Sequence, residues 1–322
     1  MQALSAALVA DGLVPARVVG LERGWCKVAS PSGELLLPVP HVAVGDWVLL
    51  DGDTVAEVLP RWSSLERLDP GGGSQVLAAN IDIVLIAAPG DRLSSARIER
   101  ELVIAWDSGA RPVVVVTKLD VAPAGAVDQL TARLVTVDVL ATSAVTGEGL
   151  DAIRALLVHP VTAALLGPSG AGKSTLVNAL LGEERLAVGA VRDDDQRGRH
   201  TTTSRQLVPL PSGGSLVDMP GLRSLGTDAS DDAIAAAFPD IEELASACRF
   251  SDCTHEVEPE CAVIAAVDAG TLDEARLASY RKLQRETAFE RRRVDPVVRQ
   301  QERDRWKSIT KQQRRQYKER DK

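Results

Sequence analysis

The glycine-rich segment from Gly167 to Thr175 constrains the fold of this chain more than any other feature of its sequence. Its spacing, Gly-x-x-x-x-Gly-Lys-Ser, wraps backbone amides around a polyphosphate, and the glycines let the backbone approach the phosphates without a Cβ in the way. Lys173 supplies a positive charge for the β- and γ-phosphate oxygens, and the Ser174 hydroxyl is expected to hold Mg²⁺. We therefore predict a P-loop that consists of Gly167, Pro168, Ser169, Gly170, Ala171, Gly172, Lys173, Ser174 and Thr175.

The residues around this segment alternate between strand-like and helix-like patterns. Apolar runs predict strands over residues 81–88, 112–116, 135–141, 161–166, 205–210 and 215–217. Helices are predicted between them, over residues 94–106, 126–134, 150–157 and 175–181. Such alternation is typical of an α/β domain, in which the ligand lies at the carboxyl ends of the strands.

The N-terminal region has a different pattern, in which short β-type runs are separated by turn signals. The runs cover residues 14–19, 25–28, 34–38, 47–50 and 55–59. Five strands in so short a segment predict a small barrel, most commonly an OB-fold, whose usual ligand is nucleic acid. A structural barrel without a ligand is an open alternative, because the chain has few aromatic residues for base stacking.

Three of the four cysteines lie close together near the carboxyl end, with a histidine among them. Their pattern, Cys-x4-Cys-x-His-x5-Cys, offers three thiolates and one imidazole, which suits tetrahedral Zn²⁺. Four protein ligands leave no position for a substrate water, so we expect one structural zinc ion. The predicted ligands are Cys248, Cys253, His255 and Cys261, whereas Cys26 is expected to be an ordinary strand thiol.

These patterns divide the chain into three expected domains. The run Gly71-Gly72-Gly73-Ser74 is typical of a linker, so we expect a barrel over residues 1–70 and a P-loop domain over residues 71–228. Residues 229–322 are expected to form a helical zinc-binding domain, with helices over 234–247, from 261 onward and over 272–293.

Charge is distributed unevenly along the chain. Residues 281–322 hold sixteen Lys or Arg and seven Asp or Glu, a net charge of +9, although the whole chain carries −8. This basic segment also contains aromatic residues and many glutamines, which suits RNA phosphates and exposed bases. A solvated charged helix is the alternative for such a segment.

Two short fragments follow predicted strands of the central domain on the amino side of the P-loop, and a third follows a strand beyond it. Thr117-Lys118-Leu119-Asp120 and Thr142-Ser143-Ala144 come first in the chain, and Asp218-Met219-Pro220-Gly221 comes after the P-loop. Asp218 is placed to reach Mg²⁺ through water, and the Gly221 amide to contact a γ-phosphate.

The first two fragments suit guanine. The Asp120 carboxylate can accept hydrogen bonds from the N1–H and 2-amino groups of guanine, whereas adenine offers a lone pair at N1 that a carboxylate repels. The Lys118 stem can cover the base plane, and the Ser143-Ala144 backbone can meet the guanine carbonyl. The combination predicts a site for GTP and GDP rather than ATP.

Taken together, the fragments resemble the G4, G5, G1 and G3 motifs of translation-factor-like GTPases, but here G4 and G5 precede G1. The chain thus resembles a circularly permuted GTPase. With a preceding OB-like barrel and a following Cys/His cluster, it is similar to the RsgA family of small-subunit-dependent GTPases. In this pattern Thr117 replaces the usual Asn, which we expect to weaken a tie between the base-binding loop and the P-loop.

The resemblance implies a GTP hydrolase that acts in late maturation of the small ribosomal subunit. The implied partners are 16S rRNA and ribosomal proteins, and the implied cofactors are Mg²⁺ and one structural Zn²⁺. We expect a cytoplasmic monomer without a membrane span or signal peptide, because no apolar run reaches about 20 residues and no basic segment precedes residues 6–10.

Catalysis requires a group other than the glutamine that orients water in Ras-like proteins, because Leu222 occupies that position. Residues 192–203 lie where switch I belongs, and one of their threonines, for which we choose Thr202, is expected to close on Mg²⁺. His200 is the candidate for positioning the attacking water, although it could instead be a solvated loop residue or contact a partner. Slow intrinsic turnover is expected.

Two other functions are compatible with parts of the sequence. The chain could be a non-catalytic RNA-binding or tethering protein that uses nucleotide as a structural ligand. It could also be an ATP-using P-loop kinase, which Asp120 argues against.

Overall fold

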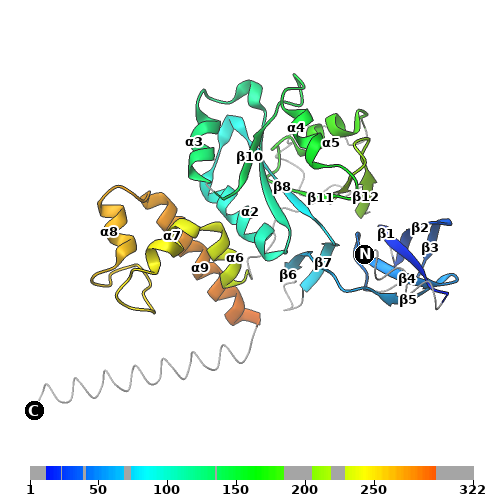
Figure 1. Ribbon diagram of the computed structural model, residues 1–322, viewed down its shortest axis with the longest axis horizontal. Helices are drawn as coiled ribbons and strands as arrows, with labels where there is room; N and C mark the ends of the chain where they lie inside the picture. The colour runs from blue at the N-terminus through cyan, green and yellow to red at the C-terminus, as the bar shows by residue number, and fades with distance from the viewer. Residues whose placement is uncertain are drawn as a thin grey trace, which may run out of the picture.

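The computed structural model describes residues 12–22, 24–38, 41–68, 74–134, 136–184, 205–218 and 229–294 (Figure 1). A strand-rich N-terminal region, a central α/β unit and a C-terminal helical unit follow one another along the chain, as expected. Within these ranges no helix combines the length and apolar character that crossing a membrane requires.

The central unit is a sheet whose described strands run in the order β10-β9-β8-β11-β13-β12. Neighbouring strands are parallel except β12, which is antiparallel to β13. The strands are β8 (Ile83–Pro89), β9 (Arg111–Thr117), β10 (Asp138–Ala141), β11 (Thr162–Leu166), β12 (Arg205–Pro209) and β13 (Ser215–Asp218). All six predicted strands are confirmed, and β10 begins three residues later than expected.

Helices cover both faces of this sheet, which explains why every residue of β8 and β11 is buried. On one face of the sheet, Val84 and Ile86 belong to a core that includes Leu102 and Leu130 from two of the helices. On the other face, Leu85 belongs to a core that includes residues of the other two helices. The helices are α2 (Ser95–Asp107), α3 (Ala126–Arg133), α4 (Leu150–Leu156) and α5 (Lys173–Leu181). The four predicted helices are thus confirmed.

The N-terminal region contains five antiparallel strands in the order β3-β2-β1-β4-β5, an order compatible with the predicted OB-fold. Alternate side chains of these strands form a separate core, which includes Cys26 as an ordinary buried thiol. The strands are β1 (Val14–Glu22), β2 (Trp25–Ser30), β3 (Gly33–Leu37), β4 (Trp47–Asp51) and β5 (Thr54–Val58). β1 also pairs with β12 at two positions, so the barrel continues the central sheet.

The prediction of a linker at residues 71–74 was wrong. Residues 71–73 lie outside the described residues, but the strands on either side, β6 (Ser64–Leu68) and β7 (Ser74–Ala79), pair with each other in antiparallel fashion. The run therefore connects two strands of a hairpin, because glycine-rich sequences suit hairpin loops as well as linkers. We propose that the domain boundary lies before β6 rather than at residue 70.

The C-terminal unit contains α6 (Asp231–Ala237), α7 (Pro239–Ala245), α8 (Ala262–Asp268) and α9 (Glu274–Val294). The single helix predicted over 234–247 is divided, because Pro239 lacks the N–H that a continuous helix needs and Phe238 has φ −129° and ψ 51°. α9 agrees with the predicted long helix. The rest of the basic segment, residues 295–322, lies outside the described residues.

A buried ion network joins the C-terminal unit to the central one. The Glu99 carboxylate on α2 is fully buried, and its Oε1 accepts hydrogen bonds from Arg133 of α3 and from Arg276 of α9. Arg276 also makes a bidentate pair with Asp240 of α7, over 2.6 and 2.5 Å. Because loss of an arginine would leave the buried Glu99 charge with fewer partners, we expect such a replacement to weaken the packing of α9 against α2.

Candidate nucleotide and metal sites

The predicted P-loop connects β11 to α5, at the carboxyl end of an interior strand of the sheet. Gly167, Gly170 and Gly172 have φ of 137°, 74° and 81°, the left-handed region in which a side chain is disfavoured. A Cβ at Gly167 would lie 2.6 Å from the Ala87 carbonyl oxygen on neighbouring β8. The spacing of the glycines thus reflects real steric requirements of the loop.

Lys173 is the first residue of α5 and bends back over the loop. Its Nζ donates hydrogen bonds of 2.7 Å to the carbonyl oxygens of Gly167 and Pro168. Ser174 and Thr175 follow in the first turn of the helix and are half-buried. The ammonium group and the amino end of α5 are therefore on the same loop, the arrangement that binds phosphates.

Thr117, the last residue of β9, ties the predicted base-binding loop to the P-loop. Its side chain is buried, and its Oγ1 donates a 2.6 Å hydrogen bond to the carbonyl oxygen of Ala171. We expected the replacement of Asn by Thr to weaken this tie, but the structure retains it because the threonine hydroxyl is also a donor. The two loops are therefore in direct contact although 54 positions separate the two residues.

The two predicted guanine-binding fragments also meet each other. The Ser143 hydroxyl donates a 2.6 Å hydrogen bond to Oδ1 of Asp120, and the Leu119 amide donates to the Thr142 carbonyl oxygen over 3.1 Å. Ala144 follows Ser143 in a turn. The Ser143 hydroxyl stabilises this turn, because its oxygen accepts a hydrogen bond from the amide of Thr146. The Asp120 side chain is exposed, as a residue that receives a base from solvent must be.

Of the predicted nucleotide residues on the carboxyl side of the P-loop, Asp218 is among the described residues. Asp218 ends β13, which pairs with β11 through Val217 and Ala164, so its backbone lies at the sheet edge where the P-loop begins. His200, Thr202 and Gly221 lie outside the described residues. Their roles therefore stay predictions.

The four predicted metal ligands come together between α7 and α8. Their ligand atoms lie within 4.8 Å of one another, and His255 and Cys261 are buried. Sγ of Cys248 lies 3.8 Å from Sγ of Cys261 and 3.6 Å from Nδ1 of His255. Nδ1 of His255 lies 3.4 Å from Sγ of Cys261.

These distances fit zinc. A tetrahedral ion with Zn–S bonds of about 2.3 Å places neighbouring sulfurs about 3.8 Å apart, as found for Cys248 and Cys261. A disulfide would require a sulfur separation of about 2 Å. The donor set and its spacing thus fit a structural zinc ion held by Cys248, Cys253, His255 and Cys261.

The chain is similar to known proteins over most of its length. A family model described as RsgA GTPase matches residues 58–228, which include every described strand of the central sheet. The chain belongs to the RsgA GTPase family. The resemblance inferred from the order of the motifs is thereby confirmed, and so is the enzyme class, a GTP hydrolase.

Named relatives of this RsgA-family chain support the assignment. A protein of Streptomyces coelicolor called small ribosomal subunit biogenesis GTPase RsgA is 48% identical over 298 residues, which cover 86% of this chain and 81% of that protein. A protein of Opitutus terrae with the same name is 44% identical over 338 residues, which cover 94% of this chain and 92% of its own length.

Solved structures share the fold. The crystal structure of YjeQ from Thermotoga maritima superimposes with a TM-score of 0.66 at 26% identity, covering 85% of this chain and 98% of that chain. YloQ, described as a circularly permuted GTPase, superimposes with a TM-score of 0.62 at 23% identity, covering 85% of this chain and 95% of that chain. The permuted fold predicted from the sequence is confirmed.

Sequence reasoning missed Glu101, an acidic residue of this RsgA-family protein beside the P-loop. Glu101 of α2 lines a pocket of about 450 Å³ together with Arg97 and with Pro168 and Ser169 of the P-loop. Burial raises the pKa of the Glu101 carboxyl to about 7, against the opposing effect of the positive charges of Arg97 and Lys173. The sequence gives no sign of this, because the contact depends on how α2 packs beside the loop.

The replacement Glu101→Gln should stabilise the nucleotide-free protein at high pH. The pKa of Glu101 in the folded state lies above its ordinary value of 4.5, so folding favours the neutral carboxyl, and its stabilising contribution is lost as the pH rises from 4.5 to about 7. Because glutamine cannot ionise, we expect the variant to gain about 3 kcal/mol relative to the parent at about pH 8 and about 1 kcal/mol at about pH 5. Melting temperatures at both pH values measure this, and an equal gain at both would contradict the assignment.

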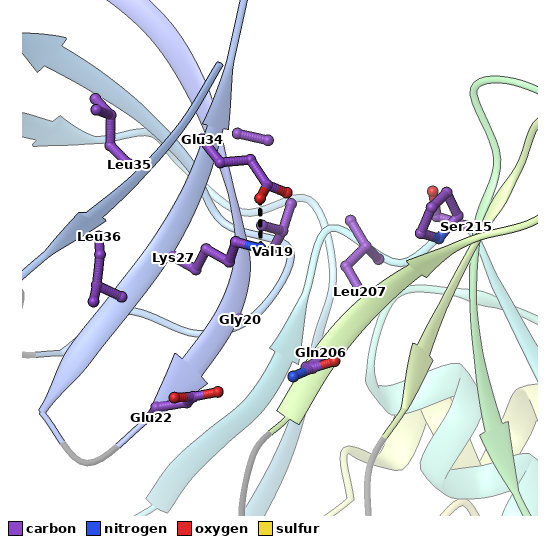
Figure 2. A pocket seen from close by; sticks show the side chains of 12 residues that line it. Val19, Gly20, Glu22, Lys27, Glu34, Leu35, Leu36, Gln206, Leu207 and Ser215 are labelled. Carbon is purple, nitrogen blue, oxygen red and sulfur yellow. Dashed lines mark ion pairs between the residues drawn. The ribbon is translucent and has the colours of Figure 1, made fainter. Parts of the chain in front are cut away.

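A separate groove lies between the barrel and the edge of the central sheet (Figure 2). It has a volume of about 810 Å³, and its walls include Leu35 and Leu36 of β3 and Leu207 of β12. Its lining residues include one cation, Lys27, which pairs with Glu34 over 2.5 Å, and the further acid Glu22. This groove is therefore unsuited to the phosphates of RNA.

Proposed function

We propose that this RsgA-family protein hydrolyses GTP during biogenesis of the small ribosomal subunit and that the subunit stimulates the reaction. The observation that carries the proposal is the 2.6 Å hydrogen bond from Thr117 to Ala171, which joins the guanine-recognition loop to the phosphate loop. The names of the relatives from Streptomyces coelicolor and Opitutus terrae support the ribosomal role.

The described residues suit distinct parts of the nucleotide. Asp120 would bind the N1–H and 2-amino edge of guanine while Ser143 fixes one of its oxygens. The P-loop amides would surround the phosphates, and Lys173 would exchange its bonds to loop carbonyls for bonds to the β- and γ-phosphates. These contacts bind and orient GTP before any bond is broken.

Magnesium would neutralise charge that develops on the β- and γ-phosphate oxygens. We propose that Ser174 and Thr202 hold the ion directly, that Asp218 reaches it through water, and that the Gly221 amide contacts the γ-phosphate. Of these residues Ser174 lies in the first turn of α5, next to Lys173 in the chain.

We propose that His200 positions the attacking water. His200→Ala should leave the Kd for GTP within about twofold of the parent and lower kcat by about 100-fold, because a positioned proton acceptor typically contributes that much. Single-turnover hydrolysis and nucleotide titration on the same samples separate the two effects. Unchanged turnover would remove His200 from the mechanism, and replacement of His159, which lies in the loop between α4 and β11, provides a control.

The partner is proposed to be the small ribosomal subunit, with its 16S rRNA and ribosomal proteins. The segment after residue 280 carries a net charge of +9, which suits binding to an RNA backbone. The groove beside the barrel is less suited to RNA, because two acidic residues and one cation line it. A monomer that works in the cytoplasm is the simplest form consistent with such a partner.

GTP turnover with purified small subunits tests the proposed function. We expect stimulation of at least about 10-fold over the unassisted rate, because the chain has no glutamine after its Asp-x-x-Gly motif to orient water. Large subunits and free rRNA serve as controls. Equal rates with small subunits, large subunits and buffer would contradict the proposal and favour a nucleotide-tethered RNA-binding protein.

A further inference from the structure

A short turn between β8 and α2, formed by Gly90, Asp91 and Arg92, lies against the guanine-recognition loop. Gly90 is buried, and a Cβ added there would lie 2.8 Å from Cβ of Ala122 and 3.0 Å from the Thr117 carbonyl oxygen. Such distances leave no room for a side chain, so glycine is needed to bring this turn so close. The turn belongs to none of the sequence motifs that define the nucleotide site.

Asp91 contacts Lys118, the residue whose stem is placed to cover the guanine plane. Oδ2 of Asp91 lies 3.3 Å from Nζ of Lys118. Lys118 itself has φ 54° and ψ 44°, a left-handed conformation that residues with a side chain seldom adopt. Lys118 therefore combines an unusual backbone conformation with an ion pair. Backbone conformations of this kind concentrate at functional sites.

Arg92 extends the contact to the phosphate loop. Its Nη2 donates a hydrogen bond of 3.4 Å to the carbonyl oxygen of Gly170, and its Nε lies 3.9 Å from Oδ1 of Asp91. Asp91 and Arg92 thus connect the lysine of one nucleotide-binding loop to the backbone of the other. This connection is separate from the one that Thr117 makes through the Ala171 carbonyl.

We infer that Asp91 and Arg92 are positioning residues for guanine nucleotides, which hold the Lys118 stem over the base and fix the distance between the two loops. The inference rests on the proposed nucleotide site. Because a side chain that lies on the base plane touches every purine alike, Asp91 affects the affinity for nucleotide but not the choice between purines. Asp120, which contacts the base edge, controls that choice.

The affinities of Asp91→Ala for GDP and IDP test this division of roles. IDP lacks the 2-amino group that Asp120 recognises but retains the base plane. We expect both Kd values to rise by about 2- to 5-fold, the range for partly exposed ion pairs, with an unchanged GDP-to-IDP ratio. In steady-state hydrolysis KM should rise by the same factor while kcat changes by less than about twofold. Asp128→Ala on α3 removes another exposed carboxylate and should match the parent.

A double-mutant cycle completes the test. In a Lys118→Ala background, Asp91→Ala should have no further effect on GDP affinity, because the group it positions is gone. Additive effects of the two replacements, parent-like affinities of Asp91→Ala, or an altered GDP-to-IDP ratio would each overturn the inference while leaving the proposed function intact. Failure of the parent protein to bind GDP would instead overturn the proposed function itself.

Discussion

Asp120→Asn should change the nucleotide preference of this protein from GTP to XTP. Guanine presents a 2-amino donor to the carboxylate, whereas xanthine presents a carbonyl oxygen at the same position, which an asparagine amide can donate to. The asparagine oxygen can still accept the hydrogen bond that Ser143 makes to Oδ1 of Asp120, so the loop should keep its geometry. We expect kcat/KM for GTP to fall by about 10⁴-fold, because an unpaired donor in a site built for hydrogen bonding is strongly rejected.

Parallel measurements of kcat/KM with GTP, XTP and ATP establish the change of preference. Asp128→Asn provides a matched control, since it removes a negative charge from the exposed surface of α3. A variant that loses GTP hydrolysis without gaining XTP hydrolysis, but remains folded, would show that Asp120 does not contact the edge of the base.

Cys261→Ala should release the metal and disrupt the segment between α7 and α8 that carries the ligands. The Cys261 thiol is buried, lies next to both Cys248 and His255, and belongs to a residue that directly precedes α8. Binding of zinc to such a site contributes about 10 kcal/mol or more, and the segment between α7 and α8 that carries the ligands has no regular secondary structure of its own. We expect loss of bound zinc and rapid hydrogen exchange over residues 246–268, whereas α9 should stay packed on α2 through Arg276 and Glu99.

Cys26→Ala is the control, because Cys26 is also a buried thiol but lies in the barrel core, far along the chain from the metal ligands. This variant should retain one zinc ion per chain, as measured by mass spectrometry of the native protein, and normal exchange in α8. A Cys261→Ala protein that keeps its full zinc content would contradict the assignment of the ligands.

Sequence patterns predicted the central unit well because its signals are local. The P-loop glycines occupy backbone conformations that glycine adopts readily, and the apolar runs of β8 and β11 are buried on both faces of the sheet. The clustering of three cysteines and one histidine was also evident, because these residue types at this spacing suit a metal site. The permuted order of the motifs did not prevent prediction of the nucleotide site, because the strands that carry them still end at the same edge of the sheet.

The features that escaped prediction depend on contacts between distant residues. The glycine run near residue 71 could not be distinguished from a linker without knowing that β6 pairs with β7. The effect of Thr117 depends on a carbonyl oxygen 54 positions away, and the pairing of Asp91 with Lys118 joins residues 27 positions apart. No periodicity or motif reports such contacts, because they arise only when the loops are brought together by the sheet.

Calorimetric titration of the parent protein with GTP and with ATP in the presence of Mg²⁺ tests the central claim, that separate fragments in permuted order form one guanine-nucleotide site. The account predicts a single site per chain that binds GTP at least about 10³-fold more tightly than ATP, because a carboxylate accepts from guanine and repels the N1 lone pair of adenine. Equal affinities for the two nucleotides would contradict it.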